Sequence, residues 1–134
     1  GYKDIGEIRF AEQHAGSFTV RQFAADVSRD IDAHKVLARR KEAEEAMAFA
    51  EEAVSSGEFD LVILDELAVA VHYNLIGLDR VLRLVRNRPG HVELVITGRD
   101  APVDLILAAD YATEMRLLRH PYQQGMQARA GVDY

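Results

Sequence analysis

The sequence predicts an α/β fold in which helices cover both faces of a mostly parallel sheet. Short apolar segments that end in polar residues alternate with longer amphipathic segments, which is the order of strands and helices in a parallel α/β domain. Residues 61–64 (LVIL) are aliphatic at every position, as expected of a strand buried on both faces. A chain of 134 residues without an internal repeat or linker predicts a single domain over residues 1–134.

The N-terminal half is expected to contain one short strand and one long helix. Residues 7–20 combine β-branched and aromatic residues with Gly16, which favours a short strand followed by a loop. Residues 26–55 have apolar positions at helical spacing against a strongly charged face. Gly57 lies just past the last turn of this helix, where glycine commonly ends helices.

The C-terminal half continues the alternation. A helix is expected over residues 78–87, ended by the following Arg-Pro-Gly, and a strand over residues 91–96 comes next. Pro102 occupies a position typical of the first turn of a short helix. The core-facing residues of that helix would be Leu105, Ile106 and Ala109. Residues 111–119 (YATEMRLLR) are expected to form a final strand.

Composition argues against several classes of function. The net charge of −6 disfavours general binding to nucleic acid or to anionic membranes, because both reward a basic surface. The chain has no cysteine, so disulfides and thiolate metal sites are excluded, which fits a reducing compartment. No apolar stretch approaches the roughly 20 residues that span a bilayer. We therefore expect a cytoplasmic protein that acts on neither nucleic acid nor a membrane.

The most informative motif is the pair Asp65 and Glu66, directly after the aliphatic run 61–64. Nucleotide-binding α/β proteins bind their ligands at the carboxyl ends of parallel strands, where a carboxylate can hold Mg²⁺ beside a triphosphate. The alternative is that the two carboxylates only cap or turn the chain. The other half of such a site, a loop of the form GxxxxGK[ST], is absent from these residues, since none of the nine glycines is followed by lysine.

A second candidate group, residues 97–99 (TGR), follows the second expected strand. The guanidinium of Arg99 could donate two hydrogen bonds to phosphate oxygens, and Gly98 would let the backbone approach a ligand closely. The alternative for Arg99 is a surface ion pair with Asp100 or Asp104.

Four blocks of the sequence resemble ATP:corrinoid adenosyltransferases of the CobA/BtuR type. They are residues 61–67 (LVILDEL), 87–89 (NRP), 95–102 (VITGRDAP) and 113–134. The last block, TEMRLLRHPYQQGMQARAGVDY, is the most specific, because it is similar to the family's ending TEM…HPF…G…A…GI(D/E)-aromatic. The resemblance covers residues 59–134 well and continues weakly back to about Gly16.

The resemblance implies a three-layer, RecA-like P-loop NTPase fold whose first strand and P-loop are missing from these residues. It implies transfer of the 5′-deoxyadenosyl group of ATP to the cobalt of a reduced corrinoid, such as cobalamin, with release of triphosphate. The implied substrates are ATP and the corrinoid, with Mg²⁺ as cofactor and a flavodoxin-like reductant as partner. A homodimer is also expected, because loss of the first strand would expose an apolar strand edge.

The resemblance also assigns roles to the strand-end residues. Glu66 and Arg99 would be catalytic, and Asp65 and Glu66 would hold Mg²⁺. Thr97 and Gly98 would contact the nucleotide.

Three further residues receive roles in the same way. His120 would close the nucleotide pocket, although a lone histidine is more often a hydrogen-bonded structural residue. Phe18 and Val20 would line the corrinoid pocket, where Val20 replaces the family's usual tryptophan. For Phe18 a place in the core is an equally good interpretation.

Two other functions stay open. Residues 1–134 are expected to be inactive on their own, and the chain could be a non-catalytic module, derived from a P-loop NTPase fold, that binds a corrinoid or a partner. It could also be a degenerate ATPase-like scaffold that acts through protein contacts. A GxxxxGK[ST] motif encoded upstream would favour the adenosyltransferase.

Overall fold

The computed structural model describes residues 6–23, 33–127 and 129. The chain divides into two compact units. Residues 29–112 form one, called here the sheet unit, and residues 1–28 with 113–134 form the other, called the terminal unit. The prediction of a single domain stays a prediction. Within the described residues, no helix is both long and apolar enough to cross a membrane.

The sheet unit contains a parallel pair of strands. β1 (Leu61–Leu64) runs beside β2 (Glu93–Ile96), with Leu61 opposite Glu93 and Leu64 opposite Ile96. Parallel neighbours need a crossover between them, and α3 (Leu67–His72) and α4 (Leu78–Asn87) provide it. The predicted α/β class with a parallel sheet is therefore confirmed.

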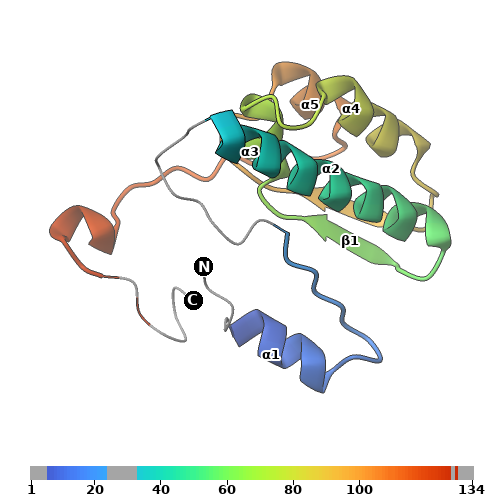
Figure 1. The fold of residues 1–134 in the computed structure, drawn as a ribbon, viewed down its shortest axis with the longest axis horizontal. Helices are drawn as coiled ribbons and strands as arrows, with labels where there is room; N and C mark the ends of the chain where they lie inside the picture. The colour runs from blue at the N-terminus through green and yellow to red at the C-terminus, as the bar shows by residue number, and fades with distance from the viewer. Residues whose placement is uncertain (1–5, 24–32, 128, 130–134) are drawn as a thin grey trace. The chain divides into compact units, whose positions relative to one another are not determined.

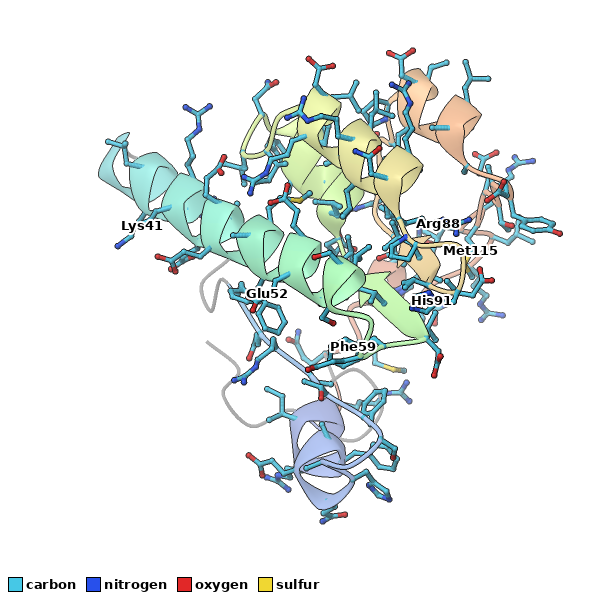
Figure 2. All side chains as sticks on the ribbon, turned by 90° about the vertical axis from the view of Figure 1, so that its right-hand side faces the viewer. Lys41, Glu52, Phe59, Arg88, His91 and Met115 are labelled. Atoms are coloured by element: carbon cyan, nitrogen blue, oxygen red, sulfur yellow. The ribbon has the colours of Figure 1, made fainter. Side chains whose placement is uncertain are left out.

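The long helix α2 (Ala33–Ser56) leads into β1, and α5 (Val103–Ala108) follows β2. In Figure 1, α2 lies alongside β1, and α4 and α5 lie side by side. The end of the long helix agrees with the expected one, while residues 26–32 lie outside the described residues. Lys41, on α2, points away from the other helices of the sheet unit (Figure 2) and pairs with Glu45 one turn on.

The core of the sheet unit lies between these helices and one face of the sheet. Alternate residues of the two strands pack against it, namely Val62, Leu64, Leu94 and Ile96. The helices and connecting segments contribute the buried cluster of Met47, Val54, Val71, Ile76, Val81, Leu82, Leu84, Val92 and Leu105. The guanidinium of Arg88 closes one end, donating to the carbonyl of Val92 and to Asp110, each at 3.1 Å.

The opposite face of the sheet is open. Leu61, Ile63 and Val95 are 52%, 55% and 42% exposed. The expectation of helices on both faces is therefore met on one face only in the described part of the chain. The aliphatic run of β1 suggested burial on both sides, but side chains alternate along a strand and only one set has a packing partner here.

The strand expected within residues 7–20 is wrong, because this segment forms helix α1 (Gly6–Gln13). Its residues include strong helix formers, and the β-branched content that suggested a strand is confined to a single isoleucine and to positions after the helix. His14 supports the helix end, since its Nδ1 lies 2.8 Å from the carbonyl of Phe10 and the two rings stack with centroids 4.0 Å apart.

The final strand expected over residues 111–119 is also wrong. The segment is irregular and its apolar side chains are exposed, because it pairs with neither strand of the described sheet. A short 3₁₀ helix, η1 (Pro121–Gln124), follows it. In α5 the expected burial of Leu105 is confirmed, whereas Ile106 and Ala109 are exposed, since so short a helix presents little more than one side chain to the core.

Candidate functional site

The carboxyl ends of β1 and β2 lie side by side and place two candidate groups together. Because Leu64 is paired with Ile96, the residues that follow them, Asp65 and Thr97, are also neighbours. The ladder extends into this region, where the N–H of Thr97 donates to the carbonyl of Leu64 at 3.2 Å. We call residues Asp65, Glu66, Thr97, Gly98 and Arg99 the strand-end site.

The hydroxyl of Thr97 connects both carboxylate residues of this site. Its Oγ1 donates to Oδ1 of Asp65 at 2.6 Å. The same oxygen accepts a hydrogen bond from the backbone N–H of Glu66 at 3.0 Å. Sequence reasoning placed each of these residues after an expected strand but missed this contact, since it depends on the pairing register of strands about thirty residues apart.

Glu66 has a left-handed backbone conformation, with φ 59° and ψ 17°, immediately before α3. This region is uncommon for residues other than glycine, asparagine and aspartate, and it costs on the order of 1–2 kcal/mol. Such strain is found preferentially at functional positions, where surrounding contacts maintain it. The glutamate side chain is exposed, so this conformation presents a carboxylate at the end of the sheet.

Gly98 allows the chain after β2 to approach α3 closely. Its φ is +134°, and a Cβ added there would lie 2.9 Å from the Cβ of Ala68 and 3.0 Å from the backbone N of Val69. The need for glycine at this position therefore comes from packing within the protein. Contact of Gly98 with a nucleotide stays a prediction.

The two carboxylates of the strand-end site carry charge that no ion pair balances within the described residues. In the part of the chain that the structure describes, neither Asp65 nor Glu66 has an ion-pair partner. Arg99 is exposed and forms no ion pair with Asp100 or Asp104 among the described residues, so the surface pairing considered as its alternative is absent there.

The donor set suits Mg²⁺ held jointly with a ligand. Among the described residues, no three or more His, Cys, Asp or Glu side chains are grouped as a complete metal cage. Magnesium normally uses one or two carboxylates and completes its shell with water and phosphate oxygens. Asp65 and Glu66 supply that number of exposed carboxylates, and one oxygen of Asp65 is oriented by Thr97.

The other predicted site residues, Phe18, Val20 and His120, belong to the terminal unit. Phe18 is 44% exposed and contacts Phe10 edge to face, with ring centroids 5.7 Å apart. Val20 is half-buried, and His120 is exposed beside η1, where its carbonyl accepts from the N–H of Gln123. The structure thus assembles the five strand-end residues, and the roles of these three stay predictions.

A second charged group lies between α2 and α4 and was not anticipated. Arg80 donates from Nε and Nη2 to the two carboxylate oxygens of Glu51, each at 2.7 Å, and its Nη1 pairs with Glu44. We call these three residues the Arg80 cluster. The hydrogen bonds from Arg80 lower the pKa of Glu51, and the same bonds raise the pKa of Arg80. The spacing of Glu44 and Glu51, two helical turns apart, was the signal available in the sequence.

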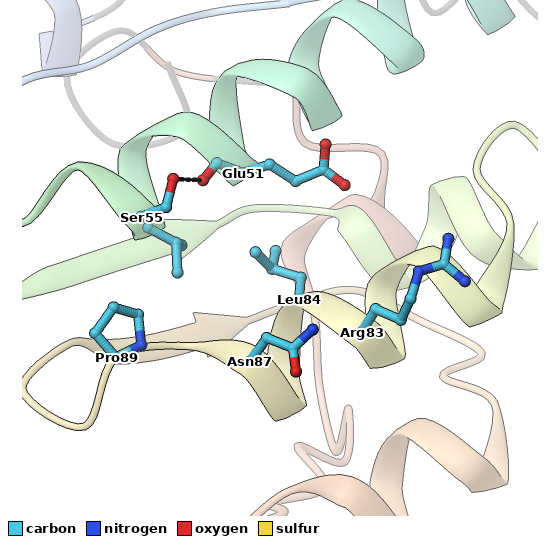
Figure 3. A pocket seen from close by; sticks show the side chains of 7 residues that line it. Glu51, Ser55, Arg83, Leu84, Asn87 and Pro89 are labelled. Carbon is cyan, nitrogen blue, oxygen red and sulfur yellow. Dashed lines mark hydrogen bonds between the residues drawn. The ribbon is translucent and has the colours of Figure 1, made fainter.

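An open pocket of about 380 Å³ adjoins the Arg80 cluster (Figure 3). Its lining comes from the last turns of α2 and α4 and the segment after α4. The lining residues are Glu51, Val54, Ser55, Arg83, Leu84, Asn87 and Pro89. Glu51 is already paired with Arg80 across α2 and α4, and the hydroxyl of Ser55 donates to the carbonyl of Glu51 within α2 at 2.7 Å. These two polar groups therefore have partners within the protein.

The sequence is similar to that of several curated proteins. It is 38% identical to a corrinoid adenosyltransferase of Sinorhizobium sp over 93 residues, which are 69% of this chain and 44% of the relative. It is 39% identical to a corrinoid adenosyltransferase of Pseudomonas aeruginosa over 92 residues, 69% of this chain and 45% of that protein. The corrinoid adenosyltransferase CobA of Salmonella typhimurium is 39% identical over 75 residues, 56% of this chain and 38% of the relative.

The matched region spans less than half the length of these relatives. The family described as ATP:corrinoid adenosyltransferase BtuR/CobO/CobP matches residues 1–134, the whole of the sequence. The resemblance carried by the motifs at the strand ends and in the C-terminal segment is thereby confirmed, and the chain belongs to the ATP:corrinoid adenosyltransferase family.

Proposed function

We propose that the full-length gene product transfers the 5′-deoxyadenosyl group of ATP to the cobalt of a reduced corrinoid and releases triphosphate. The observation that supports this most directly is the strand-end site, where two exposed carboxylates without an ion-pair partner in the described residues follow β1. Membership of the corrinoid adenosyltransferase family supports the same conclusion. The corrinoid metal is the nucleophile, so the protein need not supply one.

In this proposal the residues of the strand-end site bind and orient the triphosphate. Asp65 and Glu66 hold Mg²⁺, which neutralises negative charge on the phosphates when it is bound. Arg99 donates hydrogen bonds to phosphate oxygens as charge develops on the leaving triphosphate. Two observations support these assignments: Arg99 forms no ion pair among the described residues, and Thr97 orients Asp65.

The proposal includes a RecA-like P-loop NTPase architecture for the full-length protein. Residues 1–134 contain no GxxxxGK[ST] segment, which would supply backbone N–H groups and a lysine to the phosphates. A polypeptide of residues 1–134 alone is therefore proposed to bind ATP weakly and to transfer no adenosyl group.

Phe18 and Val20 are proposed to line the corrinoid pocket, and His120 is proposed to close the nucleotide pocket. An exposed aromatic ring such as that of Phe18 can pack on a planar ligand. A flavodoxin-like protein is the proposed source of electrons for the corrinoid. A homodimer is proposed as well, and the exposed Leu61, Ile63 and Val95 support association through the sheet.

The deciding experiment replaces Glu66 by Gln in the full-length gene product. Adenosylcobalamin formation is followed spectroscopically with ATP, Mg²⁺ and chemically reduced cobalamin. We expect the rate to fall by about 100-fold or more, because a neutral amide is a poor magnesium ligand. Glu52→Gln is the matched control, since Glu52 is exposed on α2 and forms no ion pair among the described residues. An unchanged rate and Mg²⁺ dependence for Glu66→Gln would contradict the metal assignment.

A further inference from the structure

Thr97 makes four hydrogen bonds within the described residues, and all of them reach the segment from the end of β1 to the start of α3. Its N–H donates to the carbonyl of Leu64, and its carbonyl accepts from the N–H of Ala68 at 3.1 Å. Its hydroxyl donates to Asp65 and accepts from the N–H of Glu66. Every residue from 64 to 68 except Leu67 is therefore bonded directly to this one threonine.

The hydroxyl of Thr97 has little capacity left for a ligand. A hydroxyl group has one proton to donate, and here it goes to Oδ1 of Asp65. One of its two lone pairs accepts from the N–H of Glu66. Thr97 therefore cannot donate to a phosphate oxygen unless it releases Asp65, so a hydrogen bond donated to the triphosphate would break its contact with that carboxylate.

The conformation of Glu66 depends on the same hydroxyl. A left-handed glutamate is unfavourable unless neighbouring contacts hold it, and its N–H has Thr97 Oγ1 as acceptor. The β-branched side chain of threonine restricts χ1, so the hydroxyl is held in place with little loss of entropy. Gly98 then lets the backbone beyond Thr97 pack against Ala68 and Val69. These contacts fix the direction in which both carboxylates leave the sheet.

We propose that Thr97 is a positioning residue, which orients the carboxylate of Asp65 and holds Glu66 in its left-handed conformation so that the two can bind one Mg²⁺. This inference rests on the proposed function, because it takes Asp65 and Glu66 as the metal ligands. It differs from the role expected for Thr97 from the family resemblance, which was contact with the nucleotide.

The test compares Thr97→Val and Thr97→Ser in the full-length gene product. Valine keeps the shape of threonine and removes the hydroxyl, while serine keeps the hydroxyl. Mn²⁺ binding in the presence of ATP, measured by electron paramagnetic resonance, replaces activity as the readout. We expect Thr97→Val to weaken Mn²⁺ binding by about 10- to 100-fold, as losses of residues that orient metal ligands do, and Thr97→Ser to restore it to within about threefold.

A double-mutant cycle with Asp65→Asn separates positioning from direct contact. If Thr97 acts through Asp65, then Thr97→Val should weaken Mn²⁺ binding much less when Asp65 is already Asn. If the double variant weakens Mn²⁺ binding by the product of the two single-variant factors, the inference is overturned. If Asp65→Asn and Glu66→Gln weaken Mn²⁺ binding but Thr97→Val does not, the inference fails while the proposed function stands. If neither carboxylate variant has an effect, both fail.

Amide hydrogen exchange gives a measurement that needs no altered protein. The N–H of Glu66 lies in an exposed residue, yet we expect it to be protected because it donates to Thr97. The exposed Asp100, whose N–H donates to no backbone acceptor recorded in the described residues, is the unprotected comparison. Rapid exchange at Glu66 in the unaltered protein would overturn the inference even if Thr97→Val failed to fold.

Discussion

The two charged groups of the sheet unit differ in how their charges are balanced. In the Arg80 cluster, one guanidinium reaches both Glu44 and Glu51 across two packed helices. In the strand-end site, Asp65 and Glu66 are adjacent, and the neutral hydroxyl of Thr97 donates to the carboxylate of Asp65 and accepts from the backbone N–H of Glu66. The first group is complete within the protein, whereas the second leaves negative charge exposed.

This difference separates a structural network from a candidate binding site. Paired groups such as Glu51 and Arg80 have altered pKa values because each stabilises the charge of the other. Altered pKa values often mark functional sites, but ion-pair networks produce them too. In this protein the exposed carboxylates at the end of the sheet are the better indicator, because they have no ion-pair partner among the residues that the structure describes. Substitutions in the strand-end site and in the Arg80 cluster can test this comparison.

Among the tests of this comparison, Arg99→Ala in the full-length gene product should have the largest effect. The rate of adenosyl transfer should fall by about 100-fold, since an arginine that stabilises a leaving phosphate group contributes several kcal/mol to catalysis. The melting temperature should stay unchanged, because Arg99 is exposed and forms no ion pair among the described residues. Steady-state kinetics and thermal unfolding of the same sample check both statements. A stable, fully active variant would remove Arg99 from the site.

Gly98→Ala should destabilise the sheet unit by about 2–3 kcal/mol. The added methyl group would meet Ala68 in a backbone conformation that alanine rarely adopts, so both overpacking and strain contribute. The free energy of unfolding from urea titration measures the loss. Gly90→Ala is a suitable control, since a Cβ at Gly90 meets nothing within 4 Å and its φ lies outside the positive range. Equal effects of the two substitutions would show that the approach to α3 is not close in solution.

Arg80→Ala should lower the free energy of unfolding by about 1–2 kcal/mol and leave adenosyl transfer unaffected. The estimate is modest because the pairs are partly exposed to solvent, although losing Arg80 also leaves Glu44 and Glu51 as like charges. Urea unfolding and the transfer assay are compared on the same preparation. A large loss of activity at unchanged stability would contradict the distinction between the two charged groups.

The smallest effect concerns pH. Pairing with Arg80 lowers the pKa of Glu51 in the folded protein, so its contribution to stability is present above the unfolded pKa and is lost as pH falls through the folded value. We expect Glu51→Gln to destabilise the protein at pH 7 by less than about 1 kcal/mol, because Glu51 is partly exposed. The difference from the unaltered protein should disappear well below pH 4. A difference that grew toward acid pH would have the wrong sign.

Structural features that depend on residues close together in the sequence were predicted better than features that depend on contacts between residues far apart in the sequence. The strands expected over residues 61–64 and 91–96 and the helix expected over residues 78–87 follow from local apolar patterns. All three are present, the second strand as β2 over Glu93–Ile96. The segment 111–119 has an equally strand-like pattern. A strand must also pair with the edge of a sheet, and this segment pairs with neither β1 nor β2.

The same distinction holds for the site. Asp65, Glu66 and Thr97 could be named as candidates because each follows an aliphatic run. The hydroxyl contact that joins them depends on the register of β1 and β2, and the left-handed conformation of Glu66 depends on that contact. Arg80 was missed for a related reason, since its partners lie on another helix, 29 and 36 positions earlier in the chain.

The conformation of Glu66 also bears on attempts to engineer this protein. A designer who considered only the backbone would replace Glu66 by glycine, which adopts φ 59° without strain, and would expect a more stable molecule. On our assignment that substitution would delete a metal ligand. At position 66, selection for thermal stability and selection for turnover would then favour different amino acids. A library screened for stability alone would enrich variants that lack this metal ligand.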